Sequence, residues 1–232
     1  AYKGFRVCEN GVCVYFDAND KLETFSQLSE ARDYVDFPFV YIDKNSRLER
    51  TSPETGWALT EERKENLSSG ESHLREKTIQ FLRTIQLPEN PIIFDPACST
   101  GVFLAEIKQA IPSVTTIGQD LSQSMVDEAS QRVDVTFCGC SSKPKVANNS
   151  CDFEFIRLMN SEVVNRSFAE KNINNILNTV RVGGRVIIFG HTPVLLPWAM
   201  LADLDNFKLK SCLGKIEQVE GIYQYYILER TS

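Results

Sequence analysis

Two aspartates, Asp95 and Asp120, each end a short apolar run of the kind that forms a buried strand. The first run, Ile92–Asp95, leads into a loop of small residues that opens a helical pattern, and the second, Thr115–Asp120, follows that pattern. Two such strands side by side in a parallel sheet bring both acids to one crevice at their carboxyl ends. The small-residue turn lets a ligand approach the backbone, and the second acid can accept both hydroxyls of a ribose. The spacing therefore predicts a nucleoside-binding crevice.

The turn after Asp95 lacks the GxGxxG fingerprint of dinucleotide sites. Ala97, Ser99 and Gly101 stand where a dinucleotide-binding protein places a glycine-rich turn against a pyrophosphate. The turn therefore favours a nucleoside without a pyrophosphate, and an NAD-dependent dehydrogenase is a less favoured interpretation.

The string DPACSTG at residues 95–101, followed by DLSQSM at residues 120–125, resembles the class I S-adenosylmethionine-dependent methyltransferases. In these enzymes the first turn is an acid followed by small residues at alternate positions. Glycine is commoner at those positions than the alanine and serine found here at Ala97 and Ser99. The resemblance covers about residues 90–230. It implies an α/β fold with a seven-stranded, mostly parallel sheet, helices on both faces and a reversed final strand. It also implies S-adenosyl-L-methionine as cofactor, released as S-adenosyl-L-homocysteine. It gives almost no information on the substrate.

The resemblance assigns most of the cofactor contacts. Asp95 would face the methionyl ammonium directly or through water, and Asp120 the ribose hydroxyls. Met125 would pack on the adenosine or be an ordinary core methionine, and Arg157 would bind the methionyl carboxylate or an anionic substrate, or form an ion pair at the sheet edge. The expected cofactor-binding residues are Asp95, Ala97, Cys98, Ser99, Gly101, Asp120, Leu121, Met125, Cys140, Ser141 and Arg157.

Cys140 departs from the family pattern, because an acid that bonds the adenine amino group often stands there. A thiol is a weak partner, so Ser141 or the backbone must contact the adenine. Cys138-x-Cys140 has no companion cluster of cysteine or histidine, and no metal site is predicted.

Methyl transfer from a sulfonium is an in-line displacement, which needs alignment and, for a nucleophile that carries a proton, a base. His191 follows the apolar run Arg185–Gly190 and is the first candidate for that base, with a structural turn histidine as the alternative. Glu162 is the second candidate, with a solvated helix-start acid as the alternative. The segment after residue 158 lacks the Asn/Asp-Pro-Pro-Tyr/Phe motif, which disfavours nucleic-acid and glutamine substrates.

Strands and helices alternate along residues 91–232, the pattern of a parallel sheet covered on both faces. A helix from the capping box Ser167–Glu170 is expected to end at Gly183-Gly184. A tight final hairpin turns at Glu220-Gly221. The expected strands are Ile92–Asp95, Thr115–Asp120, Val135–Cys138, Asp152–Leu158, Arg185–Gly190, Phe207–Ile216 and Ile222–Glu229.

Three regions are expected: a β-rich extension at residues 1–58, a helical connection at 59–90 with a helix over 72–87, and the Rossmann-like domain at 91–232. In the extension, an Asn10-Gly11 turn would set Cys8 across from Cys13, as two free thiols or as a disulfide or metal pair. Further strands are expected at residues 37–42 and 47–51. The extension would serve as a lid over the substrate or as a homodimer surface.

Composition narrows the function. A net charge of −6 disfavours nucleic acid, and no apolar stretch is long enough to span a membrane. Seven scattered cysteines, an odd number, favour the reducing cytoplasm, and no leader is visible. The favoured function is methyl transfer to a small-molecule acceptor. A protein methyltransferase and a catalytically silent subunit of the same fold are the alternatives.

Overall fold

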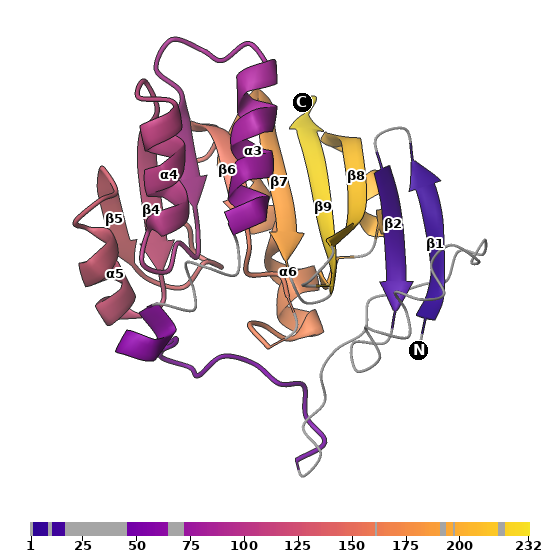
Figure 1. The fold of residues 1–232 in the computed structure, drawn as a ribbon, viewed down its shortest axis with the longest axis horizontal. Helices are drawn as coiled ribbons and strands as arrows, with labels where there is room; N and C mark the ends of the chain where they lie inside the picture. Colours follow the sequence, from indigo (N-terminus) through magenta and orange to yellow (C-terminus); the bar gives the residue numbers. More distant parts are fainter. Residues whose placement is uncertain are drawn as a thin grey trace. The chain divides into compact units, whose positions relative to one another are not determined.

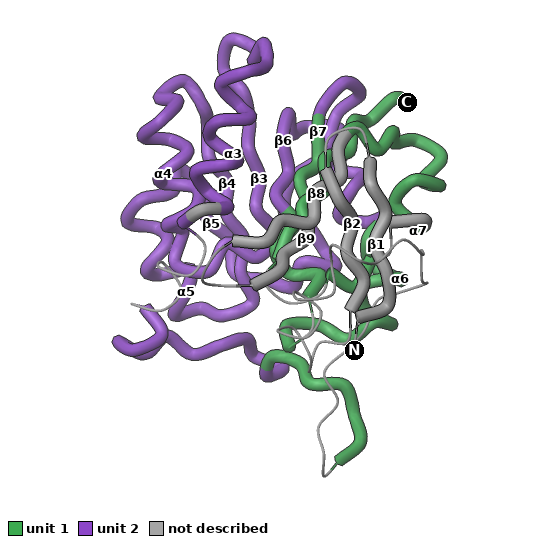
Figure 2. Tube along the Cα trace, turned by 45° about the vertical axis from the view of Figure 1, so that its right-hand side comes forward, with its two compact units in different colours: residues 1–52, 156–173, 185–232 green, residues 53–155, 174–184 purple. Residues whose placement is uncertain are grey.

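The computed structural model describes residues 2–8, 11–16, 46–64, 72–160, 162–190, 194–196, 198–217 and 221–232. The chain divides into two compact units (Figure 2). The first unit comprises residues 1–52, 156–173 and 185–232, and the second comprises residues 53–155 and 174–184. Seven strands are hydrogen-bonded in the order β5-β4-β3-β6-β7-β9-β8, and β1 and β2 form a separate two-stranded sheet.

The second unit contains the strands that carry the two aspartates. β3 (Ile92–Asp95) pairs in parallel with β4 (Thr115–Asp120) and with β6 (Cys151–Ile156), and β4 pairs in parallel with β5 (Val135–Cys138). The bounds of β3, β4 and β5 confirm the prediction. All of β6 is buried, because it lies inside the sheet between β3 and β7.

Three helices of this unit follow from amphipathic sequence. α4 (Val102–Ala110) and α5 (Gln123–Ala129) follow β3 and β4, and α3 (Ser72–Thr84) lies beside α4 on one face of the sheet (Figure 1). α3 ends at Thr84, earlier than predicted, but its apolar stripe is buried as expected at Leu74, Thr78 and Leu82.

The first unit confirms the reversed final strand. β9 (Gly221–Arg230) is antiparallel to β8 (Phe207–Glu217) and to the far part of β7 (Val180–Gly190). The buried rings of Phe189 and Tyr225 stack across β7 and β9 with centroids 5.5 Å apart. α7 (Trp198–Ala202) precedes β8.

The expected end of the helix before β7 was wrong. α6 (Arg166–Leu177) ends before Val180, and Gly183 lies inside β7. Gly183 does have the left-handed φ of 79° that was expected of it, but this φ occurs within the strand. The start was also misplaced, because the Asn165 side chain accepts the Phe168 N–H at 2.7 Å and caps the helix in place of Ser167.

The N-terminal hairpin has a different register from the expected one. β1 (Tyr2–Cys8) and β2 (Gly11–Phe16) pair Cys8 with Gly11 and Arg6 with Cys13, so the two cysteines are not opposite each other. Glycine suits the position after a two-residue turn as well as the turn itself, and here it begins the second strand. The strand expected at 37–42 lies outside the described residues, and residues 47–51 form no strand, only an isolated bridge at Glu49. Among the residues that the structure describes, no helix has the length and apolarity to cross a membrane.

Candidate functional site

Asp95 and Asp120 hold the loop that joins β3 to α4. Asp95 is 0 % exposed and its Oδ1 accepts the N–H of Ala97 at 3.0 Å. Asp120 Oδ2 accepts the N–H of Ser99 at 2.8 Å. Because Asp95 pairs with Gly118 in a parallel register, β3 and β4 end at the same edge of the sheet. The structure thus brings the two predicted acids together on one loop.

Asp120 also caps the following helix. Its Oδ1 accepts the N–H of Ser122, the N-cap residue of α5, at 2.9 Å. A carboxylate has about four acceptor positions, so two backbone N–H groups are compatible with hydroxyls of a ligand as well. The side chain is half-buried.

The loop is narrow because glycines and small residues let it pack closely. Gly101 has a φ of 77°, and a Cβ there would lie 2.7 Å from Val133 Cγ2. A Cβ on Gly118 would lie 2.7 Å from the Sγ of the buried Cys98. Ser99 also has a positive φ, 53°, which is uncommon for a residue other than glycine. Contacts with β4 and with the end of α5 and the residues after it therefore fix the loop.

Leu121 and Met125 differ in accessibility. Leu121 is 37 % exposed and presents apolar surface next to Asp120. Met125 is buried, and its Sδ lies 3.7 Å from Ser99 Oγ, so it supports the loop from inside. Of the two interpretations given for Met125, the structure shows a core contact, and a contact with adenosine stays a prediction.

A second loop at the same edge is organised by Gln119, which the sequence reasoning missed. Its Nε2 donates to the carbonyl of Cys140 at 2.9 Å, and its Oε1 accepts the N–H of Lys145 at 2.8 Å. The loop begins where the Gly139 N–H donates to the Asp120 carbonyl at 2.9 Å. Ser141 is buried in this loop, as is most of Cys140. The sequence signal that could have identified Gln119 was a glutamine inside a strand expected to be buried.

Glu154 is a second group that was missed, a glutamate buried in the middle of β6. It pairs with Phe94 of β3 and is 0 % exposed. Burial raises its pKa well above the usual value; the hydrogen bond that Thr179 can donate to the charged carboxylate opposes the rise, and the charge of Asp95 adds to it. Its Oε1 has no hydrogen-bond partner among the described residues.

The contacts of Thr179 also indicate a protonated Glu154. The Thr179 hydroxyl lies 3.1 Å from Glu154 Oε2 and 3.0 Å from the carbonyl of Ile176. A hydroxyl has one proton, and a carbonyl and a carboxylate are both acceptors. Both contacts are hydrogen bonds when Glu154 carries a proton and donates it to Thr179.

Of the two predicted catalytic residues, the structure describes only Glu162. His191 lies outside the described residues. Glu162, with a φ of 72°, forms an ion pair with Arg50 at 2.7 Å, and its N–H donates to the Arg50 carbonyl at 3.1 Å. Arg157 is half-buried directly after β6. Arg157 and Glu162 belong to the first compact unit, whereas the loop and both aspartates belong to the second.

Asn160 is a buried polar residue after β6 that the sequence reasoning did not select. Its Nδ2 donates to the carbonyl of Arg157, and its Oδ1 has no hydrogen-bond partner among the described residues. A Cβ on Gly190 would overlap that oxygen, so β7 requires glycine there. Asn160 is the first amide after the carboxyl end of β6, which was the signal available in the sequence.

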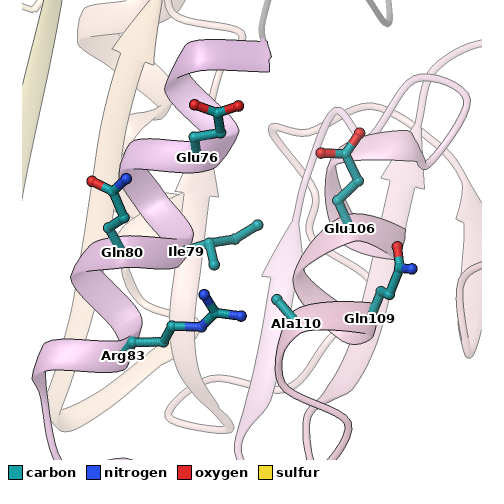
Figure 3. Close-up of a pocket in the computed structure, with 7 residues that line it drawn as sticks. All are labelled: Glu76, Ile79, Gln80, Arg83, Glu106, Gln109 and Ala110. Carbon is teal, nitrogen blue, oxygen red and sulfur yellow. The ribbon is translucent and has the colours of Figure 1, made fainter.

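A separate groove of about 540 Å³ lies between α3 and α4 (Figure 3). Its walls carry two carboxylates, two amides and one guanidinium: Glu76, Gln80, Arg83, Glu106 and Gln109, with Ile79 and Ala110 at its base. The α4 residues come from the middle and end of the helix, whereas the loop held by the aspartates precedes its start. The groove is therefore distinct from the strand-end site.

One curated protein and many solved structures are similar to this chain. Isonocardicin synthase from Nocardia uniformis subsp. tsuyamanensis is 30 % identical over 230 residues, which cover 97 % of this chain and 74 % of that protein. No protein-family model matches the chain.

Solved structures share the fold. Magnesium protoporphyrin IX methyltransferase from Synechocystis PCC 6803 with bound SAM superposes with a TM-score of 0.56 at 14 % identity, covering 76 % of this chain and 87 % of that one. A SAM-dependent methyltransferase from Aquifex aeolicus gives 0.53 at 15 % identity, covering 74 % and 100 %. The [4+2]-cyclase SpnF gives 0.53 at 12 % identity, covering 67 % and 81 %. One fold thus carries more than one chemistry, so function must be argued from the site.

Proposed function

Because this chain belongs to the class I S-adenosylmethionine-dependent methyltransferases, we propose that it transfers a methyl group from that cofactor to a small-molecule acceptor. The chain is an enzyme of this class, and its cofactor is S-adenosyl-L-methionine. When bound, the cofactor supplies a methyl group on a sulfonium, which is activated for displacement without further help from the protein. The observation that carries the proposal is that Asp95 and Asp120 accept hydrogen bonds from the backbone of one loop, at the carboxyl ends of β3 and β4.

The residues at this edge fit an adenosyl ligand. Asp120 offers a half-buried carboxylate for the ribose hydroxyls, and Leu121 offers exposed apolar surface beside it for the adenine. Asp95 is wholly buried, so we infer that it acts mainly by fixing the Ala97 amide. The backbone amides of the loop and of the start of α4, at Val102, would hold the methionyl carboxylate.

The remaining task of the protein is to align the acceptor and receive its proton. His191 stays our candidate base, because an imidazole can take a proton near neutral pH. Glu162 is a poorer candidate in view of its ion pair with Arg50.

A small-molecule acceptor is supported by the names of the similar proteins. Isonocardicin and magnesium protoporphyrin IX, which appear in the names of the relative and of one neighbour, are small molecules. The net charge of −6 also disfavours an anionic polymer. Methylation of a protein in place of small molecules would favour the alternative function.

We further propose the cytoplasm as the compartment and the N-terminal extension as a homodimer surface. Cys151 is a free, buried cysteine, which suits a reducing environment. Burial raises the pKa of Cys151 to about 12, so its thiol is unreactive. Light scattering with and without residues 1–45 tests the dimer, and a monomer in both cases would contradict it.

The test is the identity of the nucleoside product. A sulfonium carries three carbon substituents, and the nucleoside that remains after transfer identifies the carbon that left. Purified protein is incubated with the cofactor and a panel of phenols, amines and thiols, and the products are separated by mass spectrometry. We expect S-adenosylhomocysteine and a matching mass gain of one methyl group on an acceptor. Methylthioadenosine as the main acceptor-dependent product would contradict methyl transfer while preserving the cofactor assignment; this outcome is of interest because the relative is named a synthase.

A further inference from the structure

The segment before α3 lies along α5 as a strap, defined here as residues 53–64. Gly56 has a φ of 76°, and a Cβ there would lie 2.9 Å from the Ser122 nitrogen. Leu59 donates its N–H to Ser124 Oγ at 3.1 Å. The strap therefore touches the first residues of α5, directly after the ribose-binding acid proposed above.

The far end of the strap is linked to the loop between β3 and α4 by two ion pairs and a hydrogen bond. Lys64 Nζ lies 2.9 Å from Glu128 Oε1, and Figure 1 shows the helical turn that carries it beside α5. The same carboxylate binds Arg132 at 2.7 Å, and Arg132 donates to the carbonyl of Thr100 at 2.6 Å. The hydrogen bond from Lys64, followed by that from Arg132, lowers the pKa of Glu128. The strap is thus fixed at both ends.

Trp57 lies between the two anchors at Gly56 and Leu59. It is 39 % exposed, and the guanidinium of Arg63 lies 4.7 Å from the centroid of its ring. Arg63 is itself held by a hydrogen bond of 2.6 Å to the carbonyl of Ala58. A cation over one face fixes the plane of an indole and leaves the other face for a second partner.

Leu121 supplies the matching apolar surface. A Cβ on Gly56 would lie 3.3 Å from the Leu121 carbonyl carbon, so the strap and the residue after Asp120 are neighbours. Trp57 and Leu121 are two of the few large apolar side chains that are exposed among the described residues. Two exposed apolar side chains, from segments in contact beside a ribose-binding acid, match the flat apolar faces of a nucleobase.

We propose that Trp57 stacks on the adenine of the bound cofactor and forms, with Leu121, the adenine-binding wall of the site. This inference rests on the proposed function, because it uses Asp120 to place the ribose. The strap makes Trp57 a binding residue held in place before the ligand arrives, so little ordering is required on binding. No acid stands at position 140 to hold the adenine amino group, and stacking provides affinity that does not depend on such a bond.

The first test is the affinity for S-adenosylhomocysteine, measured by isothermal titration. Stacking of one base on an aromatic ring contributes enough that Trp57→Ala is expected to weaken binding about tenfold or more. Trp57→Phe keeps an aromatic face and is expected to bind within about threefold of the wild type. Trp198→Phe, at the only other tryptophan, is the matched control and is expected to leave the affinity unchanged.

The second test reads the contact directly by tryptophan fluorescence. Trp198→Phe leaves Trp57 as the single tryptophan, and we expect its emission to change on titration with the same midpoint as the calorimetry. Trp57→Phe is expected to lose most of that signal. An unchanged emission in Trp198→Phe, at concentrations where calorimetry shows binding, would overturn the inference.

A matched pair of glycine variants tests the strap. Gly56→Ala meets both an unfavourable φ and the Ser122 nitrogen, whereas Gly183→Ala meets a similar φ, 79°, with open space around it. We expect weaker binding of S-adenosylhomocysteine only in Gly56→Ala, with both variants folded by circular dichroism. Equal affinities in the two variants would contradict a strap that positions Trp57.

The outcomes separate this inference from the proposed function. If wild type and Asp120→Ala bind S-adenosylhomocysteine equally or not at all, the proposed function fails and this inference fails with it. If Asp120→Ala loses affinity while Trp57→Ala keeps it, the proposed function stands and the adenine wall alone is refuted.

Discussion

Glu154→Gln is expected to remove a pH dependence of stability that originates in the core of the sheet. Burial raises the pKa of Glu154 well above 4.5, the ordinary value. Between that value and the raised one, the native protein keeps a proton that the unfolded chain has released. The unfolded state then binds fewer protons, so the free energy of unfolding falls as the pH rises. Glutamine has the same shape, and its amide can keep a hydrogen bond with the Thr179 hydroxyl.

The magnitude follows from the proton count. A difference of one bound proton gives a slope of about 1.4 kcal/mol per pH unit across the pH window in which the unfolded chain has released this proton and the folded protein keeps it. Glu154→Gln should therefore gain stability relative to the wild type steadily as the pH rises through this window.

Urea denaturation at several pH values gives the free energy of unfolding of both proteins. Glu128→Gln is the matched control. The pKa of Glu128 is lowered in the folded state, so its stabilisation is present above 4.5 and is lost only as the pH falls through the folded pKa. The control difference should be flat across the window. A flat difference for Glu154→Gln as well would refute a protonated glutamate in β6.

Two further predictions concern the loop and the base. Gly101→Ala should destabilise the protein by more than the ~1 kcal/mol usual for a left-handed glycine, because its Cβ would lie 2.7 Å from Val133 Cγ2; urea denaturation measures this, and a smaller loss would mean that α5 yields easily. His191→Ala should lower turnover about a hundredfold while the affinity for S-adenosylhomocysteine holds, as expected for loss of a general base; full activity in a steady-state assay would make this histidine a scaffold residue.

The sequence predicted the strands that carry the site because each is a short apolar run with an unambiguous end. Ile92–Asp95 and Val135–Cys138 are bounded by prolines, glycines or charged residues, and the structure has the same bounds. Parallel pairing of the first two strands followed from the alternation of strands with helices. The position of the loop between β3 and α4 therefore followed from the sequence.

Other features were not predictable because they depend on contacts distant in sequence. Residues 53–64 have no periodicity, and only their contacts with Ser122, Ser124 and Glu128 identify a strap. Glu154 alternates with phenylalanines as if it faced solvent, but both faces of β6 are covered. The left-handed φ predicted at the glycine pair 183–184 is present at Gly183, but the helix end predicted there is not. A left-handed glycine can distort a strand as well as end a helix.

The affinity of Asp120→Ala for S-adenosylhomocysteine tests the central claim most directly. Asp127→Ala, which removes an exposed acid of the following helix α5, is the matched control, and thermal unfolding of both variants shows whether the fold is kept. Loss of charge-assisted bonds to two hydroxyls, at about 1.5–3 kcal/mol each, predicts binding weakened at least a hundredfold in Asp120→Ala and unchanged in Asp127→Ala. Wild-type affinity in a folded Asp120→Ala would contradict the account of this site.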